Sequence, residues 1–558
     1  MRNFILVLFM CFFVVAKGQE SQSMTKVTYH EFNSEGRVND SKLDMHVTEK
    51  LTHLSTPQES LRNFQDFGLR QMVTIAKFED QLFATSTSFD EMPHPEFIDS
   101  TINILEYDCS QARFMYFSNT IDVWYTEQSE IQGCPYSRYI ASPKALVLKI
   151  VVNGNHTLIA TNIEQVAFDA AYNYPLEEAK KISKAELEEK KIRSRYTVVS
   201  VFDKDTINFD PSLLKPIISH NCDGKVYRVA NGGVILKKIK IPESHAKGGY
   251  VHAKLTSWSE GDAYDRTGSI FTFSDLPNEL SILNAIQDSV GVLPFLTDSL
   301  GENYQGYTQT RNYSPSLELM RFFTSFGVHH FNDLREINNY HWADEVVYNQ
   351  EITELIPLDK KEMWIAAFIA NYDGGGHRVS LDLNFYPSFD TSDSAQRWIE
   401  PLFNTVNVLE MSGQNYPKLF KTDTLTIDFE VPQNIDNLHL LYTATGHGGW
   451  GEGDEFTPRE HKIIIDSEVI YTTTPWRTDC ATYRLSNPAS GNFGNGLSSS
   501  DLSRSNWCPA TLTPPDRIAL NHLAAGLHTI KITIEQGPDV EGGNNYWCVS
   551  GVLVGDID

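Results

Sequence analysis

Basic residues are scarce in this chain relative to acidic ones. Its 558 residues include 46 Lys and Arg against 72 Asp and Glu, which gives a formal net charge of −26 at pH 7. A protein that binds nucleic acid must present a basic face that displaces counterions from phosphates. The charge balance therefore argues against a nucleic-acid partner, and its main effect is to keep the protein soluble.

Long apolar runs are also scarce. The one strongly apolar stretch, Phe4 to Val15, follows Arg2 and leads to the small residues Ala16 and Gly18. A membrane-spanning helix needs roughly 20 apolar residues, so this shorter stretch indicates a secretory signal peptide over residues 1–18. We expect a secreted or periplasmic bacterial protein without a membrane span.

Cysteine is rare, and it never occurs in the C-x-x-C pairs typical of zinc sites. Loss of the signal peptide leaves six cysteines, and an even number permits disulfides in an exported protein. Proximity in sequence alone favours a disulfide between Cys109 and Cys134. Cys222 and Cys548 are compatible with buried thiols.

The chain is too long for one core, and its length suggests three to four domains. Residues 19–175 have mixed character: alternation over 145–152 predicts a strand, whereas Leu61 to Ile75 predicts a helix. We therefore expect an additional α+β domain there. Residues 176–195 are rich in Glu, Lys and Ala, which predicts a charged helical connector.

Beyond residue 195 the chain consists of short β-branched runs separated by Gly, Pro, Asn and Asp. This pattern is typical of antiparallel sandwiches, and we predict one over 196–390 and another over 391–558. The fold class is then mainly β, with two adjacent jelly-roll sandwiches after the α+β domain. Adjacent histidines in a strand point to opposite faces, so His329 and His330 do not indicate a metal site.

The stretch from Gly446 to Cys508 combines acids, aromatics, glycines and two cysteines without apolar periodicity. Its glycines permit positive φ and a close approach of the backbone to a ligand. Glu455 follows them and precedes the β-branched run 462–466, so this acid projects from a loop just before a strand. Functional residues often lie on such loops of a rigid scaffold.

This stretch resembles the C-terminal domain of the peptide-N-glycosidase F family. The matching features are, in order, Gly446-His447-Gly448, Asp454-Glu455-Phe456, Arg459 and His461 before a strand, Cys480, a loop rich in Gly, Ser and Asn, and Arg504-Ser505-Asn506-Trp507-Cys508-Pro509. A second segment, Asp262-Ala263-Tyr264-Asp265-Arg266, is similar to the family's Asp-x-Trp-Asp-Arg motif with Tyr in place of Trp. The resemblance does not extend to the first 195 residues.

The resemblance implies that both sandwiches contribute to one cleft, a usual place for a ligand site. There the protein would hydrolyse the β-amide bond between asparagine and the first N-acetylglucosamine of an N-glycan. Asp265 matches the family's principal catalytic aspartate, and Glu455 matches the glutamate that supports it from the other domain. Two such carboxylates position water and manage proton transfer, and the chemistry requires no metal or organic cofactor.

The resemblance also implies the residues that bind the glycan. Arg266 and Arg504 match arginines that line the site, where a guanidinium stabilises the oxyanion of amide hydrolysis. Aromatic side chains suit the apolar faces of sugar rings, and the candidates, together with a histidine at a family tryptophan position, are Tyr264, Trp450, Trp507 and His447. Cys480 and Cys508 are expected to form a disulfide beside Trp507.

One departure from the family pattern concerns a third acid. The family has an acidic residue before the last strand of the first sandwich, where this chain has Ala370. Asp373, three residues later, is available as a replacement. We expect Arg459 and His461 to be structural supports of the Glu455 loop.

Two other functions remain open from the sequence. A pair of acids is also the machinery of a glycoside hydrolase, and a jelly roll without the third acid is compatible with a non-catalytic carbohydrate-binding protein. In each case the expected partners are N-linked glycoproteins and glycopeptides, and we expect a monomer.

Overall fold

The computed structural model describes residues 23–32, 38–48, 50–54, 59–78, 80–276, 279–327, 331–334, 341–388, 396–448, 453–489, 498–539 and 544–557. They belong to two compact units, Met1–Ser194 and Arg195–Asp558. The predicted signal peptide, His329, His330, Trp450 and the border predicted between residues 390 and 391 lie outside the described residues. Within those ranges, no helix has both the length and the apolar character needed to cross a membrane.

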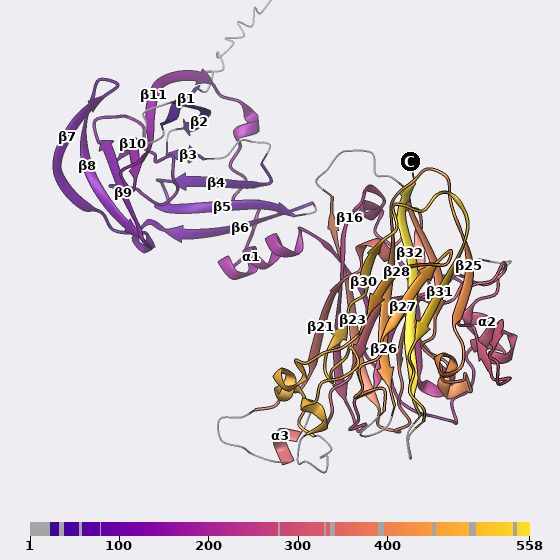
Figure 1. Cartoon of the computed structure of the whole chain (residues 1–558). Helices are drawn as coiled ribbons and strands as arrows, with labels where there is room; N and C mark the ends of the chain where they lie inside the picture. The colour runs from indigo at the N-terminus through magenta and orange to yellow at the C-terminus, as the bar shows by residue number, and fades with distance from the viewer. Residues whose placement is uncertain are drawn as a thin grey trace, which may run out of the picture. The chain divides into compact units, whose positions relative to one another are not determined.

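The first unit is built on one curved sheet of twelve strands (Figure 1). The strands are β1 (Ser23–Phe32), β2 (Val38–Thr48), β3 (Leu51–His53), β4 (Leu61–Asp66), β5 (Gln71–Phe78), β6 (Gln81–Ser88), β7 (Glu96–Ile104), β8 (Tyr107–Tyr116), β9 (Asn119–Thr126), β10 (Leu146–Val152), β11 (His156–Ala167) and β12 (Lys180–Lys181). Their order across the sheet is β12-β6-β5-β4-β3-β2-β1-β11-β10-β9-β8-β7. The strand predicted over 145–152 is β10.

The helix predicted over Leu61 to Ile75 is wrong. This stretch forms the antiparallel strands β4 and β5, joined by a turn in which Arg70 adopts a φ of 53°. Leu61 and Phe64 have the i, i+3 spacing of a helical face, but Phe64 lies opposite Val73 across the strand pair. This cross-strand pairing decides the structure, so the additional domain has much less helix than expected.

The disulfide predicted between Cys109 and Cys134 is also wrong, because both residues are free thiols buried in the main core of the first unit. Cys109 belongs to β8, and its Sγ lies 3.6 Å from the carbonyl oxygen of Tyr107. The backbone of Cys134 is held instead by the Gln65 side chain, which accepts from its N–H at 2.9 Å and donates to its C=O at 2.8 Å. Burial raises the pKa of both thiols, which keeps them inert.

The predicted connector helix forms over Lys184–Arg193 as α1. Ser183 and Glu186 close a capping box at its start, where each side chain accepts a hydrogen bond from the other residue's main-chain N–H. Glu186 therefore caps the helix rather than pairing with Lys190. Two exposed ion pairs in the last turns stabilise the solvated helix weakly.

The first sandwich of the second unit has sheets of four and six strands. The four-stranded sheet has the order β13 (Thr197–Ile207), β23 (His377–Pro387), β16 (Gly249–Ser259) and β21 (Val346–Glu351). The six-stranded sheet has the order β14 (Tyr227–Val229), β15 (Val234–Lys240), β22 (Glu362–Ile369), β17 (Thr267–Thr272), β20 (Leu317–Phe323) and β29 (Leu512–Thr513). Smaller elements are α2 (Ile282–Gln287), α3 (Phe331–Leu334) and the hairpin β18 (Phe295–Thr297) with β19 (Asn303–Gln305).

The second sandwich has two four-stranded sheets. One has the order β24 (Gln396–Asn404), β32 (Tyr546–Ile557), β26 (Ile435–His447) and β30 (Asp516–Ala519); the other has the order β25 (Leu425–Val431), β31 (Gly526–Ile534), β27 (His461–Ile465) and β28 (Glu468–Thr473). In β25 buried and exposed residues alternate strictly, as expected for a strand with one face in the core. The mainly β class with two adjacent sandwiches is thus confirmed.

The two sandwiches pack closely against each other. Leu441 of β26 and Val552 of β32 join the core of the first sandwich. Arg321 of β20 is fully buried at this junction, where it pairs with Glu318 at 2.7 Å and donates to the carbonyl oxygen of Cys548 at 2.8 Å. A buried cation stays charged only when such partners surround it, so this contact fixes the two sandwiches relative to each other.

Candidate active site

The carboxylates predicted to act together do meet, although they come from different sandwiches. Asp265 lies in the loop between β16 and β17, and Glu455 lies in the loop after β26. The Nη1 atom of Arg504 donates to Oδ2 of Asp265 at 2.8 Å and to Oε1 of Glu455 at 2.5 Å. Because one nitrogen contacts both oxygens, the distance between Oδ2 of Asp265 and Oε1 of Glu455 is at most the sum of these two distances.

Arg504 is rigidly supported. Its guanidinium lies over the rings of Trp507 at 4.5 Å and Phe456 at 5.1 Å, and its Nη2 donates to the carbonyl oxygen of Ser499 at 2.6 Å. Only 1% of its side chain is exposed, compared with 17% for Asp265 and 20% for Glu455. The cation is therefore shielded from water while the acids reach the solvent side.

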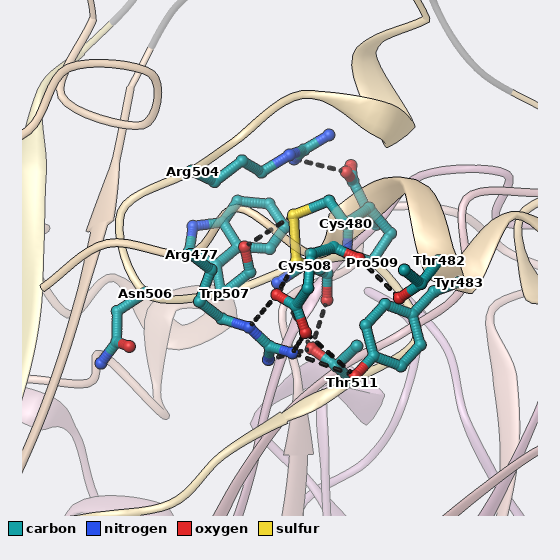
Figure 2. The surroundings of a disulfide bond; sticks show 12 residues. Arg477, Cys480, Thr482, Tyr483, Arg504, Asn506, Trp507, Cys508, Pro509 and Thr511 are labelled. Carbon is teal, nitrogen blue, oxygen red and sulfur yellow. Dashed lines mark hydrogen bonds and ion pairs between the residues drawn. A yellow bond between two sulfur atoms is a disulfide. The ribbon is translucent and has the colours of Figure 1, made fainter.

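The disulfide between Cys480 and Cys508 is present, as the family resemblance implied. Figure 2 shows it between the side chains of Arg504 and Arg477. The main chains of these two arginines form a bridge of two hydrogen bonds, 2.8 and 3.0 Å long. The disulfide thus lies in the scaffold that holds the Arg504 main chain.

The electrostatic environment of Glu455 favours its neutral form. Burial raises the pKa of this carboxyl and the nearby charge of Asp265 raises it further, whereas Arg504 acts in the opposite direction. The main-chain carbonyl of Glu455 accepts from the N–H of Ser505 at 2.9 Å, so the acid is tied to the segment that carries Arg504. A carboxyl that retains its proton at higher pH is suited to act as an acid.

The Asp265 loop is anchored by Asp262, which is buried. Asp262 is the first residue of the motif that contains Asp265, but the sequence predicted no role for it. Its carboxylate accepts from Arg266 Nε at 2.7 Å and from the main-chain N–H of Tyr264 at 3.1 Å. Burial alone would raise the pKa of Asp262, but His377 and Arg266 hold it below its usual value. Arg266 is therefore tied to Asp262 and not to Asp265.

Four residues were expected to contact sugar rings, and the structure describes three of them: Tyr264, His447 and Trp507. Of these three, Tyr264 is exposed. It is 59% exposed and stacks on Phe326, with ring centroids 6.0 Å apart. His447 and Trp507 are both buried. Trp507 stacks on Phe323 and supports Arg504 from below.

His447 belongs to the same buried stack. Its ring lies 4.9 Å from that of Tyr546 and 5.5 Å from that of Trp507. Burial, together with the charges of Arg321 and Arg504, lowers the pKa of His447 to about 3. The imidazole is thus neutral at physiological pH and packs beneath the site.

Asp373 does not point its carboxylate at the two acids. Its Oδ1 accepts main-chain hydrogen bonds from Gly375 at 2.7 Å and Gly376 at 3.3 Å, so it closes a local turn. Ala370 packs against a hydrophobic core. Neither position supplies a free third acid.

A third carboxyl, which interacts electrostatically with Arg266, is that of Glu410, for which the sequence predicted no role. It is 8% exposed, and Asn407 donates to its Oε2 at 2.9 Å. Burial raises the pKa of Glu410 to about 7, whereas Asn407, Tyr416, Arg266 and Tyr372 oppose this rise. No motif surrounds Glu410, so the sequence offered no signal for it.

Arg459 supports the Glu455 loop, as predicted. Arg459 donates to Oδ1 of the buried Asp454 at 2.7 Å, and this pair anchors the loop that carries Glu455. His461 lies within hydrogen-bond distance of the Tyr442 hydroxyl, 2.8 Å away. Within the described ranges, no three His, Cys, Asp or Glu side chains are grouped so that they would hold a metal ion.

Three models of known protein families match parts of this chain. Residues 198–385 match the model of peptide-N-glycosidase F, N terminal, and residues 415–554 match that of peptide-N-glycosidase F, C terminal. Residues 45–187 match the N-glycanase peptide, N-terminal domain. The first two models include Asp265 and Glu455, respectively.

Two solved structures of PNGF-II, in C2 and P21 space groups, are similar to nearly the whole chain. Each is 36% identical to it and covers 96% of it, and the matches span 98% and 100% of the PNGF-II chains with TM-scores of 0.85 and 0.83. No curated protein sequence matches the chain significantly. Taken with the three family models, this similarity shows that the chain belongs to the peptide-N-glycosidase F family, in a form that carries an additional N-terminal domain.

Proposed function

We propose that this protein hydrolyses the β-amide bond between asparagine and the first N-acetylglucosamine of N-linked glycans. The observation that carries the proposal is the contact of one Arg504 nitrogen with carboxylates from both sandwiches. Membership of the peptide-N-glycosidase F family supports the choice of bond. The substrates are then N-linked glycoproteins and glycopeptides.

The roles of the two acids follow from their environments. Asp265, held by Arg504, accepts a proton from the water whose oxygen attacks the amide carbon. Glu455, whose pKa is raised by burial, donates a proton to the departing amide nitrogen as the C–N bond breaks. The products are an aspartate in the peptide and a glycosylamine, which then loses ammonia in water.

The exposed ring of Tyr264 offers an apolar face to a sugar, and Arg266 lies over that ring at 5.0 Å. His447 and Trp507 support the site from within the core. The contact predicted for Trp450 remains a prediction. We further propose that Glu410, with Tyr372 and Tyr416, takes the place of the family's third acid. The charge of Arg266 lowers the pKa of Glu410, so the two side chains interact electrostatically.

An exported enzyme fits this chemistry. The Cys480–Cys508 disulfide suits an oxidising compartment, and the predicted signal peptide would direct the chain there. We propose that the protein is secreted or periplasmic and acts on glycoproteins outside the cytoplasm.

A glycoside hydrolase is the second candidate, because two carboxylates that share one arginine nitrogen lie close, as they do in retaining glycosidases. Mass spectrometry of a defined N-glycopeptide, incubated with the mature protein in a buffer containing chelator, separates the two. We expect a peptide with aspartate in place of asparagine and a glycan with an intact chitobiose core. A peptide that retains one N-acetylglucosamine would support the glycosidase, and an unchanged glycopeptide would favour a binding protein.

A further inference from the structure

Strand β21 presents an open edge. It is the last strand of its sheet, and among the described residues no strand pairs with its outer side. Such an edge offers free main-chain N–H and C=O groups, and proteins normally blunt it with Lys, Pro or a bulge. The sequence of β21, Val-Val-Tyr-Asn-Gln-Glu, contains none of these residues, and its register with β16 is unbroken.

Several other edge strands of the second unit carry such protection; β25 lacks Lys, Pro and a register shift, but Gln309 donates to the main-chain carbonyl of its Asp428 at 3.1 Å. Strand β13, on the opposite edge of the same sheet, contains Lys204 and two register shifts. Strand β24 contains Pro401 and a register shift, and β28 pairs through a register shift as well. β21 therefore differs from β13, the strand at the opposite edge of its own sheet, in lacking both Lys and a register shift.

A cleft of about 490 Å³ lies beside this edge. Val347, Tyr348 and Asn349 form one wall, and the other walls include Arg477, Tyr483 and the segment 510–514. That segment contains β29, the last strand of the facing sheet. The cleft is therefore bordered by the terminal strands of both sheets of the first sandwich.

One residue that lines the cleft, Arg477, also contacts the candidate active site. Arg477 forms a main-chain bridge with Arg504, the residue that holds both acids. The charge of Arg477 is neutralised by two hydrogen bonds to Asp479, at 2.9 and 2.7 Å. The main-chain groups along the open edge of β21 suit a peptide of variable sequence.

We propose that the edge of β21 and the adjoining cleft bind the extended peptide of the glycoprotein substrate by strand addition. The proposal rests on the proposed amidase function, since it concerns the chain on either side of the glycosylated asparagine. Main-chain hydrogen bonds to β21 supply affinity independent of sequence. The exposed side chain of Val347, 43% exposed, contacts the added strand.

The test compares a glycosylated tripeptide with a nonapeptide that bears the same glycan. We expect kcat/KM to be about tenfold higher for the nonapeptide, as a few added main-chain hydrogen bonds would give, mainly through a lower KM. N-methylation of alternate peptide amides should remove this gain in one register and preserve it in the other. Equal kcat/KM for both lengths, or no effect of N-methylation in either register, would overturn the proposal.

Two matched variants of the full chain locate the site. Val347→Asp places a charge on the β21 edge and should reduce the ratio of nonapeptide to tripeptide kcat/KM towards one. Val469→Asp, at a 51% exposed valine on the β28 edge, should retain the ratio. An unchanged ratio in Val347→Asp would contradict the proposal.

A binding measurement separates this proposal from the proposed function. Hydrogen exchange of the Asp265→Asn variant with the nonapeptide should show protection of β21 amides even without turnover. If the unmodified protein hydrolyses neither the tripeptide nor the nonapeptide, the amidase proposal fails. If either peptide is hydrolysed but β21 gains no protection, only the peptide site fails.

Discussion

The two loops that carry the acids are anchored alike. In the first sandwich the buried Asp262 binds Arg266 Nε at 2.7 Å, and in the second the buried Asp454 binds Arg459 Nε at the same distance. The loops differ in the origin of the cation that binds their acids. Arg504 belongs to the second sandwich, as Glu455 does, whereas Asp265 belongs to the first.

This difference divides the work between the sandwiches. The second supplies both the cation and the carboxyl of Glu455, whose pKa is raised by burial. The first supplies Asp265, which reaches the cation only across the junction. The site therefore forms only where the two sandwiches pack against each other. We expect substitutions in the first and in the second sandwich to affect catalysis differently.

The largest effect should come from the acid of the first sandwich. Asp265→Asn removes the carboxylate that accepts a proton from water, and we expect kcat to fall by about 10³-fold or more. Glycopeptide turnover measures the loss, with circular dichroism as the control for an intact fold. Unchanged turnover would sink the assignment of Asp265.

Glu455→Gln should cost less, about 10²-fold, and should also change the pH profile. Because the pKa of Glu455 is raised in the folded protein, its proton is present at low pH and is lost as the pH rises through the raised value. The unmodified protein should therefore lose kcat on the alkaline side, and the Gln variant should lack this limb. An identical alkaline limb in both proteins would assign the proton donor elsewhere.

Loss of the disulfide tests the rigidity of the second sandwich. The double variant Cys480→Ser/Cys508→Ser should lower the free energy of unfolding by about 2–4 kcal/mol and should weaken catalysis through Arg504. Urea unfolding gives the first quantity and glycopeptide turnover the second. Cys222→Ser is the matched control, because Cys222 is free and half-buried; a destabilisation as large as that of the double variant would contradict the account.

The last prediction concerns Glu410 and the pH dependence of stability rather than turnover. The folded-state pKa of Glu410 is about 7 against an ordinary value of 4.5, so the folded protein binds the proton more tightly and loses stability as the pH rises from 4.5 to about 7. The loss over the whole range amounts to about 3 kcal/mol. Glu410→Gln should flatten this dependence in thermal unfolding, whereas a slope equal to that of the unmodified protein would remove Glu410 as its source.

The sequence singled out three residues that meet in the structure, whereas several of their neighbours could not be predicted from it. Asp265, Glu455 and Arg504 stand in recognisable segments, and the strands around them alternate as sandwich strands do. Glu410 was missed because burial and tyrosine neighbours, not local sequence, set its pKa.

The wrong predictions have a related cause. Leu61 to Ile75 forms a strand pair because Phe64 lies opposite Val73, a contact that periodicity does not reveal. Cys109 and Cys134 are close in sequence, but Gln65 holds the backbone of Cys134 elsewhere. Long-range contacts decide both cases.

Hydrolysis of one defined N-glycopeptide in water enriched in ¹⁸O tests the central claim most directly. If water activated beside Asp265 attacks the amide carbon, the peptide product carries aspartate with one ¹⁸O atom in its new carboxylate, and the label is absent with Asp265→Asn. An unlabelled peptide that retains N-acetylglucosamine, with ¹⁸O on the released sugar, would contradict the account.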